Sequence, residues 1–123
     1  MYELTVIVEF EAAHRIVDYP GKCDRLHGHN WSVEVTVEGK KLNKLGMLID
    51  FKELKGEVNK VIDLLDHHYL NELPSFKEIN PTAENIAKFI FEKMTEAAFI
   101  NDNITISMVK IWETPKSAVC YRG

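Results

Sequence analysis

Alternating apolar and polar side chains predict two strands in the first third of the chain. In residues 30–38 every second side chain is apolar, from Trp31 to Val37, which is typical of a strand with one packed and one polar face. Residues 3–13 are rich in β-branched and aromatic side chains with partial alternation, and we expect a first strand there. The stretch 15–26 contains a Pro-Gly pair and several charges, which indicates a loop.

Apolar residues spaced three and four apart predict two amphipathic helices in the middle of the chain. The first begins after Asp50, a good N-cap residue, and the second begins after Thr82, which follows an Asn-Pro pair. The apolar positions of the first helix are Phe51, Leu54, Val58, Val61, Ile62 and Leu65. Those of the second helix are Ile86, Ile90, Met94 and Ala97.

Two further strands, at residues 105–112 and 117–121, complete the predicted elements. The order is thus β-β-α-α-β-β, with strands grouped at both ends and helices between them. This order favours an α+β domain over residues 1–123, in which an antiparallel sheet carries two helices on one face. The outer strands would leave unpaired edges, so we expect the chain to form a homo-oligomer.

Composition and charge narrow the classes of partner. Hydrophobic residues make up 46% and charged residues 28% of the chain, the balance of a globular protein. No apolar run is long enough to span a membrane, and residues 1–5 lack the pattern of an export signal, so we expect a cytoplasmic protein. The net charge of −4 argues against a nucleic-acid binder. A small phosphorylated ligand needs only a local basic pocket, for which Lys22, Arg25 and Lys116 are candidates.

Three histidines form the strongest candidate site. His27 and His29 are two residues apart, so in an extended segment their side chains point to the same side. His14 ends the first predicted strand, which we expect to pair with the second. Three imidazoles that meet at one ion are typical of an open catalytic zinc site, although iron, nickel or copper also accept them. The alternative is a hydrogen-bonded loop that brings histidines together without an ion.

The two cysteines lie in different surroundings and are not expected to form a disulfide. Cys23 lies four residues before His27 and has three interpretations. It is a fourth zinc ligand that closes a structural site, a reactive thiol beside the metal, or an ordinary loop cysteine. The spacing slightly favours the ligand. Cys120, in a predicted strand, is interpreted as a packing residue.

Five further residues are candidates for acid–base chemistry or ligand binding. Asp66 precedes two histidines, His67 and His68, near the end of the first predicted helix, and spacing does not choose between these histidines. One of them can act as a general acid or base, or simply complement the helix dipole. Glu84 lies in the first turn of the second helix, and Glu113 ends an apolar strand, where a carboxylate can accept paired N–H donors. The alternative for both is a solvated acid.

Six short segments carry a resemblance to a known family. They are residues 10–15 (FEAAHR), 23–30 (CDRLHGHN), 46–51 (GMLIDF), 65–67 (LDH), 81–85 (PTAEN) and 112–115 (WETP). In this order over one small chain they resemble the 6-pyruvoyltetrahydropterin synthase / 6-carboxytetrahydropterin synthase family nearly end to end. The resemblance implies a tunnelling fold (T-fold), in which subunits join their sheets into a barrel. It also implies a homohexamer made of two trimers, with active sites between subunits.

The resemblance further implies roles for individual residues. The implied zinc ligands are His14, His27 and His29. By the same resemblance Cys23 is the catalytic thiol rather than a ligand, and His67, with Asp66 beside it, is the catalytic histidine that reaches Cys23 of a neighbouring subunit. Glu113 matches a charge-relay carboxylate near the pterin, and Glu84 matches a pterin-anchoring one.

The implied substrate is 7,8-dihydroneopterin triphosphate, and the family divides by product. One branch, in queuosine biosynthesis, releases triphosphate and acetaldehyde and leaves 6-carboxy-5,6,7,8-tetrahydropterin. The biopterin branch stops at 6-pyruvoyltetrahydropterin. Only three residues separate Cys23 from His27, and this short spacing resembles the 6-carboxy branch. A rival hypothesis of another class is a zinc-stabilised structural or binding module in which Cys23 is the fourth ligand.

Overall fold

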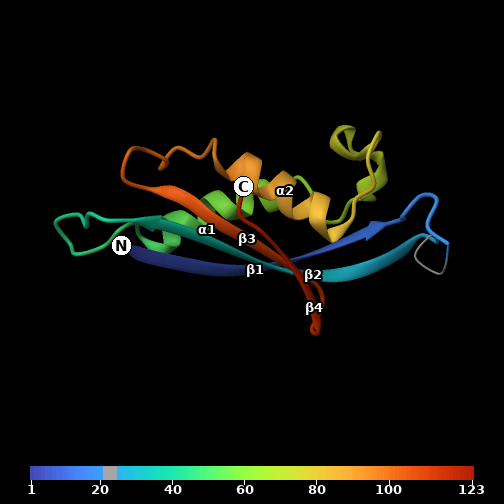
Figure 1. Cartoon of the computed structure of the whole chain (residues 1–123), viewed down its shortest axis with the longest axis horizontal. Coiled ribbons are helices and arrows are strands. Elements are labelled where there is room, and N and C mark those ends of the chain that lie inside the picture. Colours follow the sequence, from blue (N-terminus) through green and yellow to red (C-terminus); the bar gives the residue numbers. More distant parts are fainter. Residues whose placement is uncertain (21–24) are drawn as a thin grey trace.

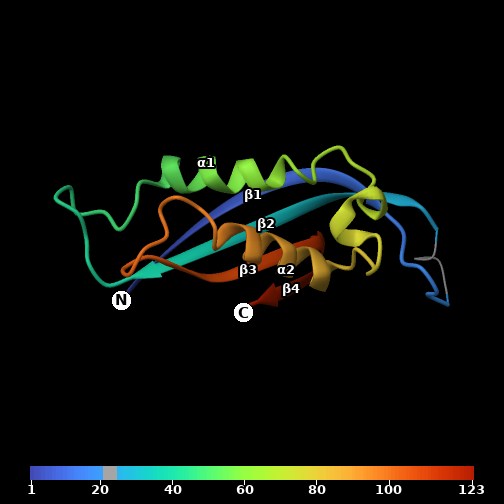
Figure 2. The ribbon, with the colours of Figure 1, turned by 90° about the horizontal axis from the view of Figure 1, so that it is seen from above.

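The computed structural model, which describes residues 1–20 and 25–123, is a four-stranded antiparallel sheet with two helices on one of its faces (Figure 1). The strands lie in the order β1-β2-β3-β4. Helix α1 packs over β1, and α2 packs over β3 and β4 (Figure 2). The bounds of these elements are β1 Tyr2–His14, β2 His27–Gly39, α1 Phe51–Ile62, α2 Ala83–Met94, β3 Thr105–Thr114 and β4 Ser117–Tyr121. The predicted α+β class and element order are confirmed.

Between α1 and α2 the chain makes two short 3-10 helices, η2 at Leu70–Glu72 and η3 at Pro74–Phe76. These helices lie near the end of the sheet at which β1 finishes and β2 begins (Figure 1). In the described residues, no helix is long and apolar enough to cross a membrane.

The alternation along β1 and β2 builds the core. Side chains at every second position of both strands are buried, and they lie directly opposite one another, as Val8 lies opposite Val33. The core residues of β2 are Trp31, Val33, Val35 and Val37, all without exposed surface. Strand β2 begins at His27, three residues earlier than the predicted start at Asn30. This early start follows from pairing with β1, because His27 lies opposite His14.

Both predicted helix caps are present. Asp50 Oδ1 accepts a hydrogen bond from the Lys52 N–H at 2.8 Å, and Thr82 Oγ1 accepts one from the Asn85 N–H at 3.2 Å. Each bond satisfies a backbone donor that the first turn of a helix leaves free. The helices therefore begin where the sequence predicts.

The predicted apolar stripes are partly wrong at their ends. The Phe51 side chain is 59% exposed, because it begins α1 beyond the edge of the core. Leu65 is fully buried although α1 ends at Ile62, since the chain turns back toward the sheet after the helix. Ala97 likewise lies past the end of α2.

The interpretation of Cys120 as a packing residue is wrong in the single chain. Cys120 is exposed, and it lies on β4, which forms one edge of the sheet. Its neighbours Val119 and Tyr121 pack against the core instead. Because successive side chains of a strand point to opposite faces, Cys120 points to the face that no described helix covers.

Candidate metal centre

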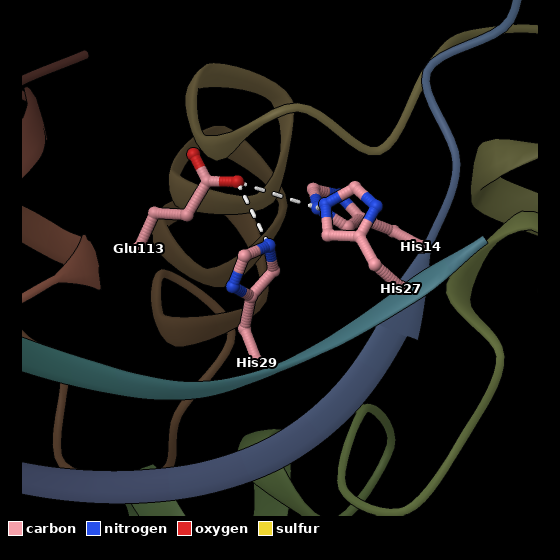
Figure 3. A group of neighbouring side chains, drawn as sticks. All are labelled: His14, His27, His29 and Glu113. Carbon is pink, nitrogen blue, oxygen red and sulfur yellow. Dashed lines mark hydrogen bonds and ion pairs between the residues drawn. The ribbon is translucent and has the colours of Figure 1, made fainter. Parts of the chain in front are cut away.

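Three histidine side chains meet at one end of the sheet, where β1 finishes and β2 begins (Figure 3). His14 lies directly opposite His27, and His29 lies opposite Ala12. All three therefore point to the face that carries the core. The ring centroids are 4.5 Å apart for His14 and His27, 5.0 Å for His14 and His29, and 4.5 Å for His27 and His29.

A carboxylate from β3 completes this group. Glu113 Oε1 lies 3.1 Å from His29 Nε2 and 3.4 Å from His14 Nε2. One ligand atom from each of the four residues lies within 4.8 Å of every other. Glu113 reaches the group because Trp112 lies opposite Ser32 of β2, so the next residue of β3 points to the same face as His29. We call these four residues the His–Glu group.

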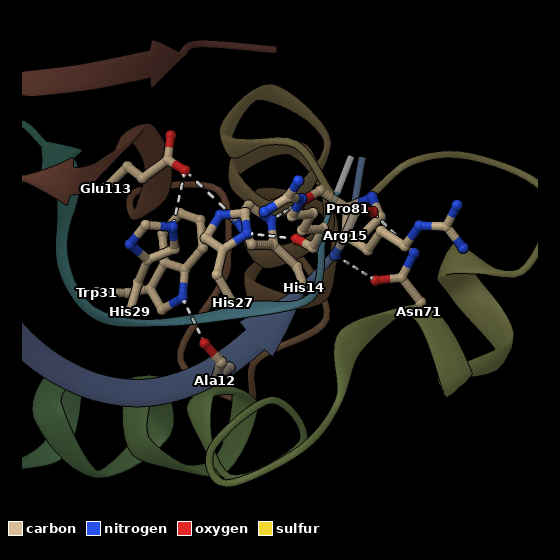
Figure 4. Close-up of polar contacts among 10 residues, drawn as sticks. Ala12, His14, Arg15, His27, His29, Trp31, Asn71, Pro81 and Glu113 are labelled. Atoms are coloured by element: carbon tan, nitrogen blue, oxygen red, sulfur yellow. Dashed lines mark hydrogen bonds and ion pairs between the residues drawn. The ribbon is translucent and has the colours of Figure 1, made fainter. Parts of the chain in front are cut away.

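Hydrogen bonds fix which ring nitrogens carry protons in two of the histidines. His14 Nδ1 donates to the carbonyl oxygen of Pro81 at 2.8 Å (Figure 4), and His27 Nδ1 donates to that of Arg25 at 2.7 Å. A carbonyl oxygen only accepts, so each Nδ1 carries the proton and each neutral ring keeps a lone pair on Nε2. These two Nε2 atoms lie 3.0 Å apart. Two lone pairs that face each other at this distance repel, and a cation between them would relieve the repulsion.

Burial favours the neutral form of two residues of the group, His14 and His29. Burial is the largest cause that lowers the pKa of His14 from 6.5, and the nearby His27 lowers it further, against the Pro81 hydrogen bond and Glu113. Burial also lowers the pKa of His29. His29 Nε2 is buried and makes no hydrogen bond within residues 1–20 and 25–123, although Glu113 Oε1 lies 3.1 Å away.

The composition of the His–Glu group suits a metal ion. Neutral imidazole nitrogens and a carboxylate oxygen are ligands that divalent transition ions accept. An ion would bond to the lone pair of the buried His29 Nε2, which forms no hydrogen bond with the described residues. The residues present therefore fit a metal, and the group can hold one.

Asp66 and His67 form a second cluster, together with Glu11 of β1. His67 Nδ1 lies 2.9 Å from Asp66 Oδ1, and His67 Nε2 lies 3.5 Å from Glu11 Oε2. The Glu11 N–H donates to Asp66 Oδ1 at 3.0 Å, and this bond is the main cause that lowers the pKa of the Asp66 carboxyl. The His67 ring is 74% exposed, and its backbone has a positive φ of 58°.

The structure separates the two histidines that spacing could not. The ring of His68 donates to the carbonyl oxygen of Asp66 at 2.8 Å and forms no ion pair among the described residues, whereas the His67 ring forms ion pairs with Asp66 and Glu11. Glu11 was not identified from the sequence as a neighbour of His67. Its position on a strand carries no local signal, since alternation predicts only that its side chain is exposed.

Two adjoining cavities connect these clusters. One of about 650 Å³ is lined by Glu11, His29 and His67, among others. The other, of about 720 Å³, is lined by His29, Trp112 and Glu113, among others. Both include Gly28, His29 and Asn30, so the two cavities adjoin at the start of β2.

The remaining candidates lie apart or outside the described residues. Glu84 is exposed in the first turn of α2 and makes no ion pair with the His–Glu group in the part of the chain that the structure describes. Lys116 is exposed in the turn between β3 and β4, and Arg25 is exposed beside His27. Cys23 and Lys22 lie outside the described residues. Their predicted roles stay predictions.

Comparison with known proteins gives consistent matches over the whole chain. The family model described as 6-pyruvoyl tetrahydropterin synthase matches residues 3–123. A protein of Rickettsia conorii named 6-carboxy-5,6,7,8-tetrahydropterin synthase is 34% identical, over 97% of this chain and 99% of its own length. A 6-pyruvoyl tetrahydrobiopterin synthase of Dictyostelium discoideum is 39% identical, over 84% of this chain and 75% of its own.

A solved structure gives the same picture at the level of the fold. The 6-pyruvoyl tetrahydropterin synthase of Caenorhabditis elegans superposes with a TM-score of 0.87 at 30% identity. The superposition covers 99% of this chain and 95% of that one. The likeness therefore extends over both strand pairs and both helices.

Proposed function

This chain belongs to the 6-pyruvoyl tetrahydropterin synthase family, and we propose that it is a zinc-dependent 6-carboxy-5,6,7,8-tetrahydropterin synthase. Its protomer has the T-fold expected from the resemblance. The observation that carries the proposal is the His–Glu group, with its facing Nε2 atoms and a buried His29 Nε2 that makes no hydrogen bond to any described residue. Relatives that carry the 6-carboxy name, in Rickettsia conorii and Haemophilus influenzae, match nearly the full chain and support the choice of product.

In this proposal His14, His27 and His29 hold zinc through their Nε2 atoms. A zinc ion held there would polarise the hydroxyl oxygens of the substrate side chain and would make the neighbouring C–H bonds more acidic. Glu113 orients the substrate, since its carboxylate can accept paired N–H donors of the pterin ring beside the histidines. Glu84 is proposed as a second anchor for the pterin.

Proton transfer is assigned to three residues. The Cys23 thiolate removes a carbon-bound proton, and His67 carries protons to and from the substrate. Asp66 holds the ring of His67 through Nδ1 and leaves Nε2 to exchange the proton. Loss of triphosphate follows, and addition of water then breaks a carbon–carbon bond. The carboxyl carbon stays on the pterin, and two carbons leave as acetaldehyde.

We propose that the active unit is a homohexamer, a dimer of trimers, in which residues 1–123 form one domain of each subunit. Strands β1 and β4 are the two edges of the sheet, and each can pair with a further strand. Joined edges would produce the barrel expected of a T-fold and would place His67 of one subunit near Cys23 of another. The enzyme would act in the cytoplasm, in queuosine biosynthesis.

A second candidate is a 6-pyruvoyltetrahydropterin synthase, which releases triphosphate without cleaving the side chain. The Dictyostelium relative carries a name of this kind at 39% identity, and so does the Caenorhabditis elegans structure. Mass spectrometry of the products from 7,8-dihydroneopterin triphosphate separates the two activities.

The zinc-loaded protein is compared in that assay with a Cys23→Ala variant. We expect 6-carboxytetrahydropterin with acetaldehyde from the native chain, and a variant that keeps zinc without turnover. A 6-pyruvoyl product would move the protein to the other branch. If the native chain has no turnover and Cys23→Ala loses zinc, the chain is a zinc-stabilised structural module instead.

A further inference from the structure

The loop before α2 is bonded to the His–Glu group at one point. His14 Nδ1 donates to the carbonyl oxygen of Pro81 at 2.8 Å, and the side chain of His14 is only 1% exposed (Figure 4). This bond holds the proton on Nδ1 and turns Nε2 toward the other histidines. The direction of the Pro81 carbonyl therefore decides how well His14 presents its lone pair.

Asn80, the residue before this proline, is held at both its side chain and its backbone. Its Oδ1 accepts from the Val17 N–H at 3.0 Å, and its Nδ2 donates to the Val17 carbonyl oxygen at 3.1 Å. Its own carbonyl oxygen accepts from Asn85 Nδ2 at 2.8 Å and from the Thr82 N–H at 2.9 Å. The Asn80 side chain thus pairs with the backbone of Val17 as a neighbouring strand would.

The ring of Pro81 limits the directions in which the Pro81 carbonyl, the group bonded to His14, can point. The pyrrolidine ring fixes φ of Pro81, so few torsions separate the position of Asn80 from the direction of the Pro81 carbonyl. Val17, to which the Asn80 side chain is hydrogen-bonded, lies only three residues after His14 along the chain. Asn80 therefore connects Val17, in the segment after His14, with Pro81, whose carbonyl oxygen bonds the His14 ring.

Asn71 makes the same pair of hydrogen bonds without this connection. Its Oδ1 accepts from the Arg15 N–H at 2.8 Å, and its Nδ2 donates to the Arg15 carbonyl oxygen at 2.9 Å (Figure 4). Arg15 follows His14 directly, yet Asn71 is ten residues away from Pro81 in the chain. The side chains of Asn71 and Asn80 thus make similar pairs of hydrogen bonds to the backbone after His14, and of these two residues Asn80 is next to Pro81 in the chain.

We propose that Asn80 is a positioning residue for the metal: it fixes the tautomer and orientation of His14 through the Pro81 carbonyl. The inference rests on the proposed zinc site. Residues that hold a metal-bound histidine through its second ring nitrogen strongly affect metal affinity, and their loss costs roughly 10–100-fold. Asn80 acts one step further out, so a loss near the lower end, about 10-fold, is expected.

The test compares Asn80→Ala with Asn71→Ala. Each variant loses two similar hydrogen bonds to the backbone of the segment after His14. Zinc affinity is measured by competition with a coloured chelator. We expect about 10-fold weaker zinc binding for Asn80→Ala and no change for Asn71→Ala. Thermal melting of both metal-free variants shows whether they lose stability to a similar extent, which separates positioning from a general loosening.

A second measurement needs no metal. Long-range proton–nitrogen NMR spectra report which ring nitrogen of His14 is protonated, and we expect Nδ1 in the native chain and a mixture of tautomers in Asn80→Ala. Asn80→Asp keeps the acceptor for the Val17 N–H, so it should recover part of the zinc affinity. If Asn80→Ala does not fold, Asn85→Ala replaces it, because that change frees only the Asn80 carbonyl of one of its donors.

The outcomes distinguish this inference from the proposed function. If the native chain and Asn80→Ala bind zinc equally well and His14 keeps its tautomer, the positioning role is wrong while the zinc site stands. Equal losses in Asn80→Ala and Asn71→Ala would also overturn it. A native chain that binds no zinc overturns both this inference and the zinc-dependent function.

Discussion

Acidification of the metal-free protein is expected to destabilise the fold through His14. The side chain of this residue is 1% exposed, and burial lowers its pKa below 6.5. The folded protein therefore keeps His14 neutral at a pH where the unfolded chain would bind a proton. Unfolding then takes up a proton, and the free energy of unfolding falls as the pH falls.

The size of this effect follows from proton linkage. Below pH 6.5 and above the folded pKa, one group changes the free energy of unfolding by up to about 1.4 kcal/mol per pH unit. The loss ends once the pH has fallen below the pKa of His14 in the folded state. His29 acts in the same direction, because burial lowers its pKa as well. Its side chain is 21% exposed, so solvent screening makes its share smaller.

Urea denaturation of the chelator-treated protein measures this dependence at constant ionic strength, from about pH 7.5 to about pH 5.5. His14→Asn should flatten the slope below pH 6.5. Two results would refute the reasoning. One is a native protein whose stability does not fall over this range, and the other is a His14→Asn variant with the native slope.

Three further predictions test the core, a helix cap and the exposed cluster. Leu54→Ala should lower the free energy of unfolding by about 2–5 kcal/mol in urea denaturation, because Leu54 is fully buried. Phe51→Ala, at an exposed position of the same predicted helix face, should lower it by no more than about 0.5 kcal/mol. Equal effects of the two changes would contradict the burial pattern. Thr82→Ala should cost about 1 kcal/mol in the same assay, because the Asn85 N–H loses its partner, and an unchanged midpoint would count against the cap. Glu11→Gln should slow turnover without changing zinc affinity, because its carboxylate lies 3.5 Å from His67 Nε2. A variant with native turnover would show that this contact does not assist His67.

The elements of the fold could be predicted because each has a local period. Alternation in residues 30–38 and the apolar spacing after Asp50 are short-range patterns that a sheet face and a helix face impose directly. The start of β2 at His27 could not be predicted in the same way. Its first residues are polar, and only the pairing with β1 makes them part of the strand. The exposure of Phe51 also escaped prediction, since periodicity does not say where the core ends.

One part of the candidate site could likewise be predicted from the sequence, and another part could not. The proximity of His14, His27 and His29 follows from spacing in a strand and from the pairing of two neighbouring strands. The position of Glu113 against these histidines depends on the β2–β3 register, which shifts at Thr36 and Val37. Such an irregularity leaves no signal in a single sequence.

The same alternation that builds the core also creates the candidate metal site. Along the buried face of β1 and β2 the opposed pairs are Val8 with Val33, Phe10 with Trp31, Ala12 with His29 and His14 with His27. The apolar pairs end in a stacked Phe10 and Trp31, and the histidines continue on the same face. Because His14 occupies a core position, it is desolvated, and desolvation keeps its imidazole neutral. A metal requires the neutral form, so the burial that stabilises the sheet also prepares the ligand to bind.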